Sequence, residues 1–474
     1  MLVAAKAGRN SGCSLIERDH FFAARIVRLF IQCNFMNAID RPLPGAPPGP
    51  EAVDSSVQNG APPDDRWAST LAALRSAGDV YHPEWRVLRR LLHQHPETSG
   101  AEYQTTQQLG HFLERHGIPY RLAEDGRGLV ADIGDCSTAK RRVAIRGDID
   151  ALPIQTMLQT EYASQLPGAM HACGHDVHAT TAVGAGVLLH RLSEQGRLPP
   201  DFAARIVLQP AEETSQGAKH MIRSGALKDI DTAVALHVDP SLETGSIGVR
   251  RGALTANCDL FQVDFHGTGG HGARPHLSTD PLSAGVAWIN QAYRQLPRHA
   301  DPFDPMAISV GRFSAGTTAN VIPSQATLEG TLRTVSEGNQ RTAKRQLEHL
   351  SRGVEAMTDV IVVLKFFEPT PGVVNSGHLC DAVDRAAGML ESVRQTIAIE
   401  RPSLGGEDFA FFGEKVPIVM FRLGSRRPGA SDSESTAHAL HTPLFDVDPD
   451  CLRIGAEMLA LSALLVRPKS PETG

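Results

Sequence analysis

The apolar positions of the chain follow two periodicities, which predict its helices and strands. Over residues 67–95, apolar side chains recur at three- and four-residue intervals, the spacing of an amphipathic helix. Residues 105–115 show the same spacing and are followed by Gly117 and Pro119, residue types that commonly end a helix. The first part of the chain is therefore predicted to be helical.

After these helices, short apolar runs alternate with helical stretches. The runs at 143–145, 206–208 and 233–236 predict strands, and the Ala- and Gly-rich stretch 180–192 predicts a helix between the first two. A further strand is predicted at 418–421, near the C-terminus. This alternation predicts a fold of the α/β class, with helices on the faces of a sheet.

The middle of the chain, residues 255–370, has a different pattern. Four runs have strand character and two have helical spacing, at 260–265, 280–296, 307–310, 326–332, 339–357 and 361–366. Their order, β-α-β-β-α-β, is that of a ferredoxin-like domain. We therefore expect an inserted domain here, which divides a larger domain into residues 67–254 and 371–474.

The composition is that of an ordinary globular protein and excludes several classes of function. Of 474 residues, 41 % are hydrophobic and 21 % charged, and 46 Lys and Arg against 53 Asp and Glu give a net charge of −7. Nucleic-acid binding, which needs a clustered excess of basic residues, is not expected. No apolar run reaches the ~18 residues of a membrane span, so no membrane partner is expected. Seven scattered cysteines are no disulfide framework and favour a reducing, cytoplasmic location.

Residues 1–66 differ from the rest of the chain. The apolar stretch 21–35 contains two arginines, which the apolar core of a secretion signal would not normally hold. The Pro-rich segment 42–50 predicts an extended linker. We expect a disordered extension with one short amphipathic helix at most, and Met36 is a candidate translation start.

Polar side chains follow three of the predicted strands. Asp148 and Asp150 follow the first strand, Glu212 and Glu213 the second, and His237 the third. Adjacent glutamates alone would more commonly belong to a solvated surface. In α/β proteins, however, the C-terminal ends of parallel strands share one edge of the sheet, where ligands bind. The three groups together therefore predict an active site at that edge.

The run Met-His-Ala-Cys-Gly-His-Asp-Val-His at 170–178 is the densest set of candidate metal ligands. Cys173 and His175 are two residues apart, so on a helix they would point to different sides. In a turn they can converge on one ion, and the glycine between them permits close backbone approach. We therefore expect a turn that presents Cys173 and His175 to a metal, with His171 and His178 in supporting positions.

Two further motifs lie near the C-terminus. The sequence His-Ala-Leu-His-Thr-Pro at 438–443 places His441 in a predicted loop, where it could bind a metal or serve the structure. The Gly-rich acidic segment 403–409 could line a pocket, cap a helix, or do both.

Several of these motifs occur together, and in the same order, in one known family. They are Asp-Ile-Asp-Ala-Leu-Pro, Met-His-Ala-Cys-Gly-His-Asp, Gln-Pro-Ala-Glu-Glu, Gly-Gly-His-Gly-Ala-Arg-Pro-His, Asn-Val-Ile-Pro, Gly-Thr-Leu-Arg-Thr and Gly-Gly-Glu-Asp-Phe. Over residues 80–465 the chain resembles the metallo-amidohydrolase and carboxypeptidase family that includes hippurate hydrolase, bacterial N-acyl-amino-acid amidohydrolases and plant auxin–amino acid conjugate hydrolases.

The resemblance implies a fold and an assembly. The fold is a zinc-peptidase-like α/β catalytic domain with an inserted ferredoxin-like α+β dimerisation (lid) domain, in agreement with the pattern of elements. It implies a homodimer formed through the inserted domain. It also implies two divalent metal ions per subunit, Mn²⁺ or Zn²⁺, with Co²⁺ and Ni²⁺ as alternatives, because a thiolate ligand is soft and accepts several of these ions.

The resemblance also implies roles for individual residues. The implied metal ligands are Cys173, which bridges both ions, His175, Glu213, His237 and His441. Glu212 matches the general base, and Asp148 and Asp150 match carboxylates that orient ligand histidines. His271 matches a histidine that stabilises the tetrahedral intermediate and reaches the partner subunit's site in dimeric relatives. Asn320 and Arg333 match groups that contact substrate, with Arg333 placed for a substrate carboxylate.

The implied activity is metal-dependent hydrolysis of the amide bond of N-acyl amino acids, with a carboxylic acid and a free amino acid as products. The same site would equally serve a dipeptidase or a metallocarboxypeptidase, because the shape of the pocket sets the substrate. A catalytically silent binding scaffold would be expected to lack some of the ligands or Glu212, and all of them are present.

Overall fold

A computed structural model of the chain describes residues 65–135, 137–430 and 438–467. The extension was predicted for residues 1–66. Its residues 1–64, with the short helix and the candidate start at Met36, lie outside the described residues, and residues 65 and 66 begin the first described helix.

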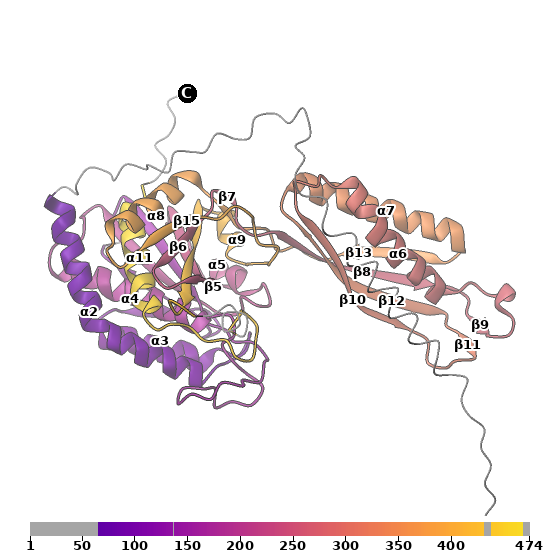
Figure 1. Cartoon of the computed structure of the whole chain (residues 1–474), viewed down its shortest axis with the longest axis horizontal. Coiled ribbons are helices and arrows are strands. Elements are labelled where there is room, and N and C mark those ends of the chain that lie inside the picture. Colours follow the sequence, from indigo (N-terminus) through magenta and orange to yellow (C-terminus); the bar gives the residue numbers. More distant parts are fainter. Residues whose placement is uncertain (1–64, 136, 431–437, 468–474) are drawn as a thin grey trace, which may run out of the picture. The chain divides into compact units, whose positions relative to one another are not determined.

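An eight-stranded mixed sheet forms the larger part of the fold (Figure 1). Its strands, in spatial order, are β1 (Tyr120–Leu122), β2 (Leu129–Ile133), β4 (Phe202–Gln209), β3 (Arg141–Asp148), β5 (Thr232–Glu243), β16 (Ile418–Arg426), β6 (Ser246–Val249) and β15 (Gln395–Ala398). The four central strands β4, β3, β5 and β16 are parallel to one another. They contain the four apolar runs predicted as strands, so the α/β class is confirmed.

Helices pack against this sheet and carry most of its apolar contacts. They are α2 (Asp65–Gln94), α3 (Tyr103–Arg115), α4 (His175–Glu194), α5 (Gly217–Arg223), α8 (Gly377–Met389), α9 (Ala410–Gly413) and α11 (Cys451–Leu465). The central helix α4 packs against α2, α11 and β3, and it is buried along nearly its whole length. A side chain at Gly184 would meet Ala456 at 3.0 Å and Trp85 at 3.2 Å, so a glycine here lets the three helices approach closely.

The three helices predicted in this part of the chain are present. Helices α2 and α3 agree with their predicted spans within two residues. Helix α4 begins five residues before the predicted start, at His175, because the ligand motif itself forms the first turn.

A separate four-stranded antiparallel sheet lies in the middle of the sequence. Its spatial order is β10 (Met306–Ala315), β12 (Gln325–Thr334), β8 (Asn257–His266) and β13 (Ile361–Phe366). With α6 (Pro281–His299) and α7 (Glu337–Thr358), it has the predicted β-α-β-β-α-β order. Phe261, Trp288 and Leu347 are fully buried in its own core. The domain boundaries at 255 and 370 stay a prediction.

Short paired segments accompany both sheets. Strand β9 (Gly270–His271) pairs with β11 (Val321–Ile322) beside the 3₁₀ turn Pro275–Leu277, and β7 (Gly252–Ala253) pairs with β14 (Val374–Asn375). In the part of the chain that the structure describes, no helix has the length and apolarity needed to cross a membrane.

Candidate metal centre

The candidate site lies where the central parallel strands end. Asp148 is the last residue of β3, and its partner on β4 is the strand-ending Gln209. Glu212 and Glu213 follow β4 directly, and His237 lies on the neighbouring β5. The polar groups of three separate strands are thus brought together as predicted. His237, however, lies within the twelve-residue strand β5 and not after it, as the sequence had suggested.

The Cys-Gly-His motif forms a turn rather than a helix interior. Gly174 caps the N-terminus of α4 in the left-handed conformation with φ 85°, and His175 is the first helical residue. A Cβ atom on residue 174 would lie 2.4 Å from the side chain of Val238, so both space and backbone conformation require glycine. The turn aims Cys173 and His175 at the same site.

Among the described residues, five groups of side chains have the composition and spacing of metal ligands, and two of them contain Cys173. One group is Cys173, His175 and His237, and the other is Cys173, Glu213 and His441. The Cys173 Sγ atom lies 3.6 Å from His237 Nε2 and 3.3 Å from His441 Nε2. The Glu213 Oε1 atom lies 3.4 Å from His441 Nε2. The five predicted ligands therefore converge around one sulfur atom.

In two of the predicted ligand histidines the Nδ1 atom forms a hydrogen bond within the protein, which leaves the Nε2 atom for a metal. His175 Nδ1 donates to Asp150 Oδ1 at 3.0 Å, and His237 Nδ1 donates to the backbone oxygen of Val238 at 2.8 Å. Metal-binding histidines commonly donate their other nitrogen in this way. His175 Nε2 and Glu213 Oε1 are buried and have no hydrogen-bond partner. Such atoms fit a site built for a divalent ion.

His441 reaches the site from a strained backbone position. Its φ of 61° is in the left-handed region, which residues other than glycine rarely adopt. Its backbone N–H donates to the oxygen of Ala172 at 2.7 Å, which holds the loop against the Cys173 turn. Strain of this kind is concentrated at functional sites, where the surrounding contacts maintain it.

His178 lies beside the site but has no nitrogen free for a metal. Its Nδ1 atom donates to Asp148 Oδ1 at 2.7 Å, and its Nε2 atom accepts the backbone N–H of Val238 at 2.9 Å. The supporting position predicted for His178 agrees with this geometry. Asp148 hydrogen-bonds His178, and its Oδ2 atom also lies 3.7 Å from Nε2 of the predicted ligand His175. Asp150 hydrogen-bonds His175 through Nδ1.

Burial and neighbouring charge alter the acid–base properties of two groups at the site. Burial raises the pKa of Glu212 well above its ordinary value, and the carboxylates of Glu407 and Asp408 raise it further. Burial likewise raises the pKa of the Cys173 thiol. Both shifts disfavour the anionic forms of Glu212 and Cys173, and a bound cation would oppose these shifts.

The carboxylates of Glu212, Glu407 and Asp408 lie close enough together to hold a cation. The protein itself provides a positive charge there, the guanidinium of Arg146. The fully buried Arg146 pairs with Glu407 Oε1 at 2.9 Å, with Asp408 Oδ1 at 3.1 Å and with Asp148 Oδ2 at 2.6 Å. Sequence reasoning did not assign Arg146 a role. The available signal was an arginine that directly follows the apolar run 143–145 and stands two residues before Asp148.

A cavity of about 540 Å³ opens onto the Cys173 site. Its walls include Glu212, Glu213, His237 and His441 and also the predicted substrate residue Arg333, whose Nη1 atom donates to the backbone oxygen of Leu404 at 2.8 Å. The cavity is thus large enough for a small substrate and has a cation on its wall.

His271 and Asn320 lie together, but they do not line this cavity. His271 pairs with Val321 across β9 and β11, and the N–H of Gly272 donates to the backbone oxygen of Asn320 at 2.9 Å. Both side chains are exposed. One subunit therefore brings these two predicted site residues next to each other, without bringing them to the Cys173 site.

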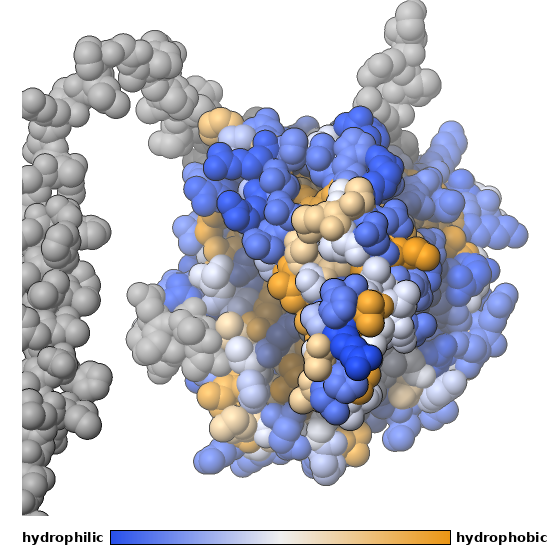
Figure 2. Space-filling view, turned by 90° about the vertical axis from the view of Figure 1, so that its right-hand side faces the viewer, coloured by the Kyte–Doolittle hydropathy of each residue, from blue (hydrophilic) through white to orange (hydrophobic). Residues whose placement is uncertain are grey.

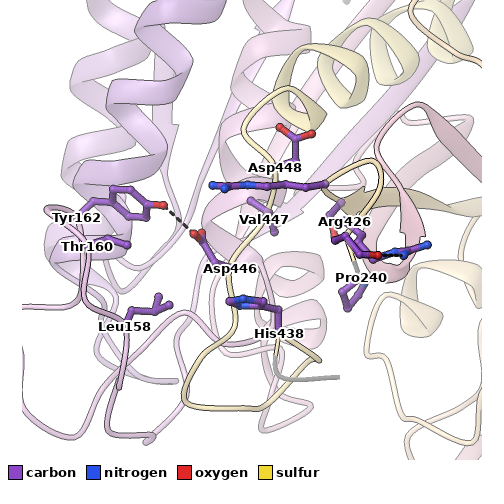
Figure 3. A pocket seen from close by; sticks show the side chains of 12 residues that line it. Leu158, Thr160, Tyr162, Pro240, Arg426, His438, Asp446, Val447 and Asp448 are labelled. Atoms are coloured by element: carbon purple, nitrogen blue, oxygen red, sulfur yellow. Dashed lines mark hydrogen bonds between the residues drawn. The ribbon is translucent and has the colours of Figure 1, made fainter. Parts of the chain in front are cut away.

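A second cavity, of about 280 Å³, lies beside the loop that carries His441 (Figure 3). Tyr162 donates its hydroxyl to Asp446 Oδ2 at 2.7 Å on one side of this cavity, and His438 lies below Asp446 in this view (Figure 3). His438 therefore faces a different cavity from His441.

Comparison with known proteins decides the family. The model of peptidase family M20/M25/M40 matches residues 144–464, which include all of the predicted site residues. This chain belongs to that family. The family predicted from the motifs is thereby confirmed, and the protein is a hydrolase of the metal-dependent amidohydrolase and peptidase type.

Relatives within family M20/M25/M40 have several activities. The chain is 33% identical to an N-acetylcysteine deacetylase of Bacillus subtilis over 391 residues, which cover 82% of this chain and 98% of that protein. It is 33% identical to a thermostable carboxypeptidase of Saccharolobus solfataricus, covering 80% of this chain and 95% of the relative. A dinuclear metal-binding peptidase of the M20 family from Bacillus subtilis has the same fold, with a TM-score of 0.69, 30% identity, and coverage of 81% of this chain and 98% of that one.

Proposed function

We propose that the protein hydrolyses the amide bond of N-acyl amino acids, releasing a carboxylic acid and a free amino acid. The observation that carries this proposal is that two candidate ligand groups share Cys173 at the mouth of a 540 Å³ cavity that also contains Glu212 and Arg333. The deacetylase among its relatives acts, by its name, on an N-acyl amino acid.

The five side chains Cys173, His175, Glu213, His237 and His441 would hold two divalent ions, Mn²⁺ or Zn²⁺ or, alternatively, Co²⁺ or Ni²⁺. Such ions supply polarisation of the substrate carbonyl and lower the pKa of the attacking water. Cys173 would bind as a thiolate, which accepts each of these ions. Asp150 would keep the His175 ring oriented through Nδ1.

Glu212 is the proposed general base. Its carboxylate lies 3.8 Å from His175 Nε2 and is almost fully buried, next to the place where a water must attack. It would take the proton of that water as the carbonyl is attacked and pass it to the leaving nitrogen. A raised pKa suits this second step, because the protonated form must be stable enough to act as an acid.

Arg333 is the proposed partner of the substrate α-carboxylate. It faces the cavity, and its guanidinium is held by the oxygen of Leu404 while having no carboxylate within ion-pair distance among the described residues. A guanidinium binds a carboxylate with two parallel hydrogen bonds, which fixes the substrate in one orientation.

His271 and Asn320 would act on the site of a second subunit. Both residues are exposed and lie outside the cavity of their own chain, which supports the proposal that they act across a homodimer. Helix α6 supports such an interface, because Leu282, Val286 and Tyr293 form an exposed apolar face opposite the buried Trp288. Exposed apolar side chains are scattered among polar ones on the face that Figure 2 presents. In the dimer His271 would stabilise the developing oxyanion, assisted by Asn320.

A dipeptidase or metallocarboxypeptidase is the second candidate. The similarity to a thermostable carboxypeptidase favours it, since the same ligands and base would hydrolyse a peptide bond. The cytoplasmic location stays a prediction.

The proposal is tested by hydrolysis of hippurate and a panel of N-acetyl amino acids. The protein is first stripped of metal and then assayed with and without added Mn²⁺ or Zn²⁺. Release of free amino acid that depends on added metal would support the proposal. Hydrolysis of dipeptides alone would favour the second candidate, and no turnover of any substrate with any metal would favour a silent scaffold.

A further inference from the structure

Arg422 places a positive charge on the wall of the catalytic cavity. It lies on β16, where its strand partner is His237, and its half-buried side chain lines the 540 Å³ cavity. Its neighbours Phe421 and Leu423 are fully buried. An arginine between two buried apolar residues of a central strand is unfavourable for packing, and such departures are expected where function requires them.

The charge of Arg422 has no counter-ion among the described residues. No hydrogen bond or ion pair is formed by its guanidinium within residues 65–135, 137–430 and 438–467. The acidic groups that influence it are engaged elsewhere: Glu407 Oε1 pairs with Arg146 at 2.9 Å, and Asp239 Oδ1 accepts the N–H of Ser241 at 2.9 Å. Burial accordingly lowers the pKa of Arg422 more than Asp239, Glu407 and Cys173 raise it. Binding of an anion would stabilise this partly buried guanidinium, because it would supply the missing counter-ion.

Arg422 differs from the other lysine and arginine of the cavity wall because each of those already has a partner or a proposed role. Lys219 is neutralised by Glu368 at 2.7 Å. Arg333 is the proposed partner of the substrate α-carboxylate. Once Lys219 and Arg333 are accounted for, Arg422 is the cation left over in the described part of the cavity wall, and it lies on a different strand from Arg333.

We propose that Arg422 binds a second carboxylate of the substrate, so that the enzyme prefers N-acyl amino acids that carry two negative charges. The inference rests on the proposed function and specifies its substrate class. A guanidinium recognises a carboxylate through two hydrogen bonds in a fixed geometry. The second carboxylate can belong to an acidic amino acid or to a dicarboxylic acyl group, and the experiment below distinguishes these sources.

The test compares substrates that differ only in charge. The kcat/KM of the metal-loaded full chain is measured for N-acetyl-L-glutamate against N-acetyl-L-glutamine. It is also measured for N-succinyl-L-alanine against N-succinamyl-L-alanine, in which an amide replaces the terminal carboxylate of the acyl group. We expect at least one doubly charged member to be favoured by about 10-fold or more, the usual effect of a charge-assisted hydrogen bond. The pair that shows the preference tells which side of the amide carries the carboxylate.

Variants then assign the preference to Arg422. In Arg422→Met the preference should fall to near one, and in Arg422→Lys, which keeps the charge, part of it should remain. The matched control is Arg385→Met, because Arg385 is an exposed residue of α8 far from the site in sequence and forms no hydrogen bond or ion pair with described residues. This control should keep the full preference.

Three results would overturn the inference. The first is no preference in either substrate pair, and the second is a preference that Arg422→Met leaves unchanged. The third is that Arg422→Met lowers kcat/KM by the same factor for both substrates of a pair. The last would mean that Arg422 acts on a step common to all substrates. If no N-acyl amino acid is hydrolysed at all, the proposed function fails, and calorimetry still decides on Arg422. In that case, equal binding of N-acetyl-L-glutamate and N-acetyl-L-glutamine by the metal-loaded protein would contradict the inference, and tighter binding of the glutamate that is lost in Arg422→Met would support it.

Discussion

Nδ1 of His175 lies 3.0 Å from Oδ1 of Asp150, and this hydrogen bond decides which atom of His175 faces the candidate metal site. With Nδ1 donating to a carboxylate, the lone pair of Nε2 points to the site that Cys173 and Glu213 share. Asp150 also accepts the N–H of Glu213 at 3.0 Å and the hydroxyl of Ser99 at 2.6 Å. One buried carboxylate thus positions two of the proposed ligands.

Replacement of Asp150 should therefore weaken metal binding. In Asp150→Asn the side chain keeps its size but loses the charge that holds the His175 tautomer, and we expect metal affinity to fall about 10- to 100-fold. Competition with a chromophoric chelator would measure this. Glu400→Gln, which neutralises an exposed carboxylate away from the site, is the control and should bind metal normally. Unchanged affinity in Asp150→Asn would contradict the proposed role.

Replacement of Glu212 should abolish turnover and leave the metal bound. Glu212→Gln removes the proposed base but none of the five proposed ligands, and a general acid–base residue commonly contributes about 10²- to 10⁴-fold to the rate. Steady-state kinetics and metal analysis of the same preparation would measure both effects. Full activity in Glu212→Gln would rule out the assignment.

Arg89 should be important for stability rather than for chemistry. Its buried guanidinium pairs with Asp176 Oδ2 at 2.7 Å and with Asp446 Oδ1 at 3.1 Å. Arg89→Met would leave two buried carboxylates without a counter-ion, and we expect a loss of about 3–5 kcal/mol in the free energy of unfolding. Urea denaturation would measure it. The control Arg86→Met, one turn away on α2, removes an arginine that forms no hydrogen bond or ion pair with described residues and should cost far less.

The same ion pairs predict how stability depends on pH. Burial raises the pKa of Asp176 and Asp446. Arg89, together with the hydrogen bonds from His93 to Asp176 and from Tyr162 to Asp446, outweighs burial, so both pKa values lie below the ordinary value of 3.8. Because the folded state binds these protons less readily than the unfolded state, the pairs stabilise the protein above about pH 4, and this stabilisation is lost as pH falls through the lowered pKa values.

In Arg89→Met burial is no longer opposed by Arg89, so the two carboxylates take up protons at higher pH than in the wild type. We therefore expect the free-energy difference between wild type and Arg89→Met to shrink as the pH falls from about 7 to below about 4. Urea denaturation of metal-free protein at several pH values would show this. A difference that stays the same at acid pH would mean that Arg89 stabilises through packing and not through its charge.

If His271 serves the partner subunit, two inactive variants should restore activity to each other. Glu212→Gln and His271→Ala should each be inactive as homodimers. After mixing and subunit exchange, half of the dimers are mixed, and each holds one site with both residues, so about a quarter of wild-type activity is expected. Size-exclusion mass would verify the dimer. No recovery from an exchanged mixture would mean that His271 does not act across the interface.

Much of the fold could be predicted because it is encoded locally. The helices 67–95 and 105–115 and the strands 143–145 and 206–208 depend on the spacing of apolar residues a few positions apart, which is visible in the sequence. The boundary of α4 could not be found in this way. Its start depends on Gly174, whose conformation places the Cys173 turn before the first helical residue.

The sequence by itself determined the family, the α/β class, and the five side chains that the structure brings around one site. It did so because these residues stand in short motifs, each tied to the end of a strand.

Only the tertiary structure decided how those side chains are used. It shows that Asp148 supports His178, that Arg146 occupies the acidic group beside Glu212, and that Arg422 reaches the cavity. It also shows that His271 does not reach the cavity of its own subunit. The physical reason is that hydrogen-bond partners and counter-ions are contacts between segments as far apart as β3 and the loop after β15, and their geometry is set by packing rather than by local spacing.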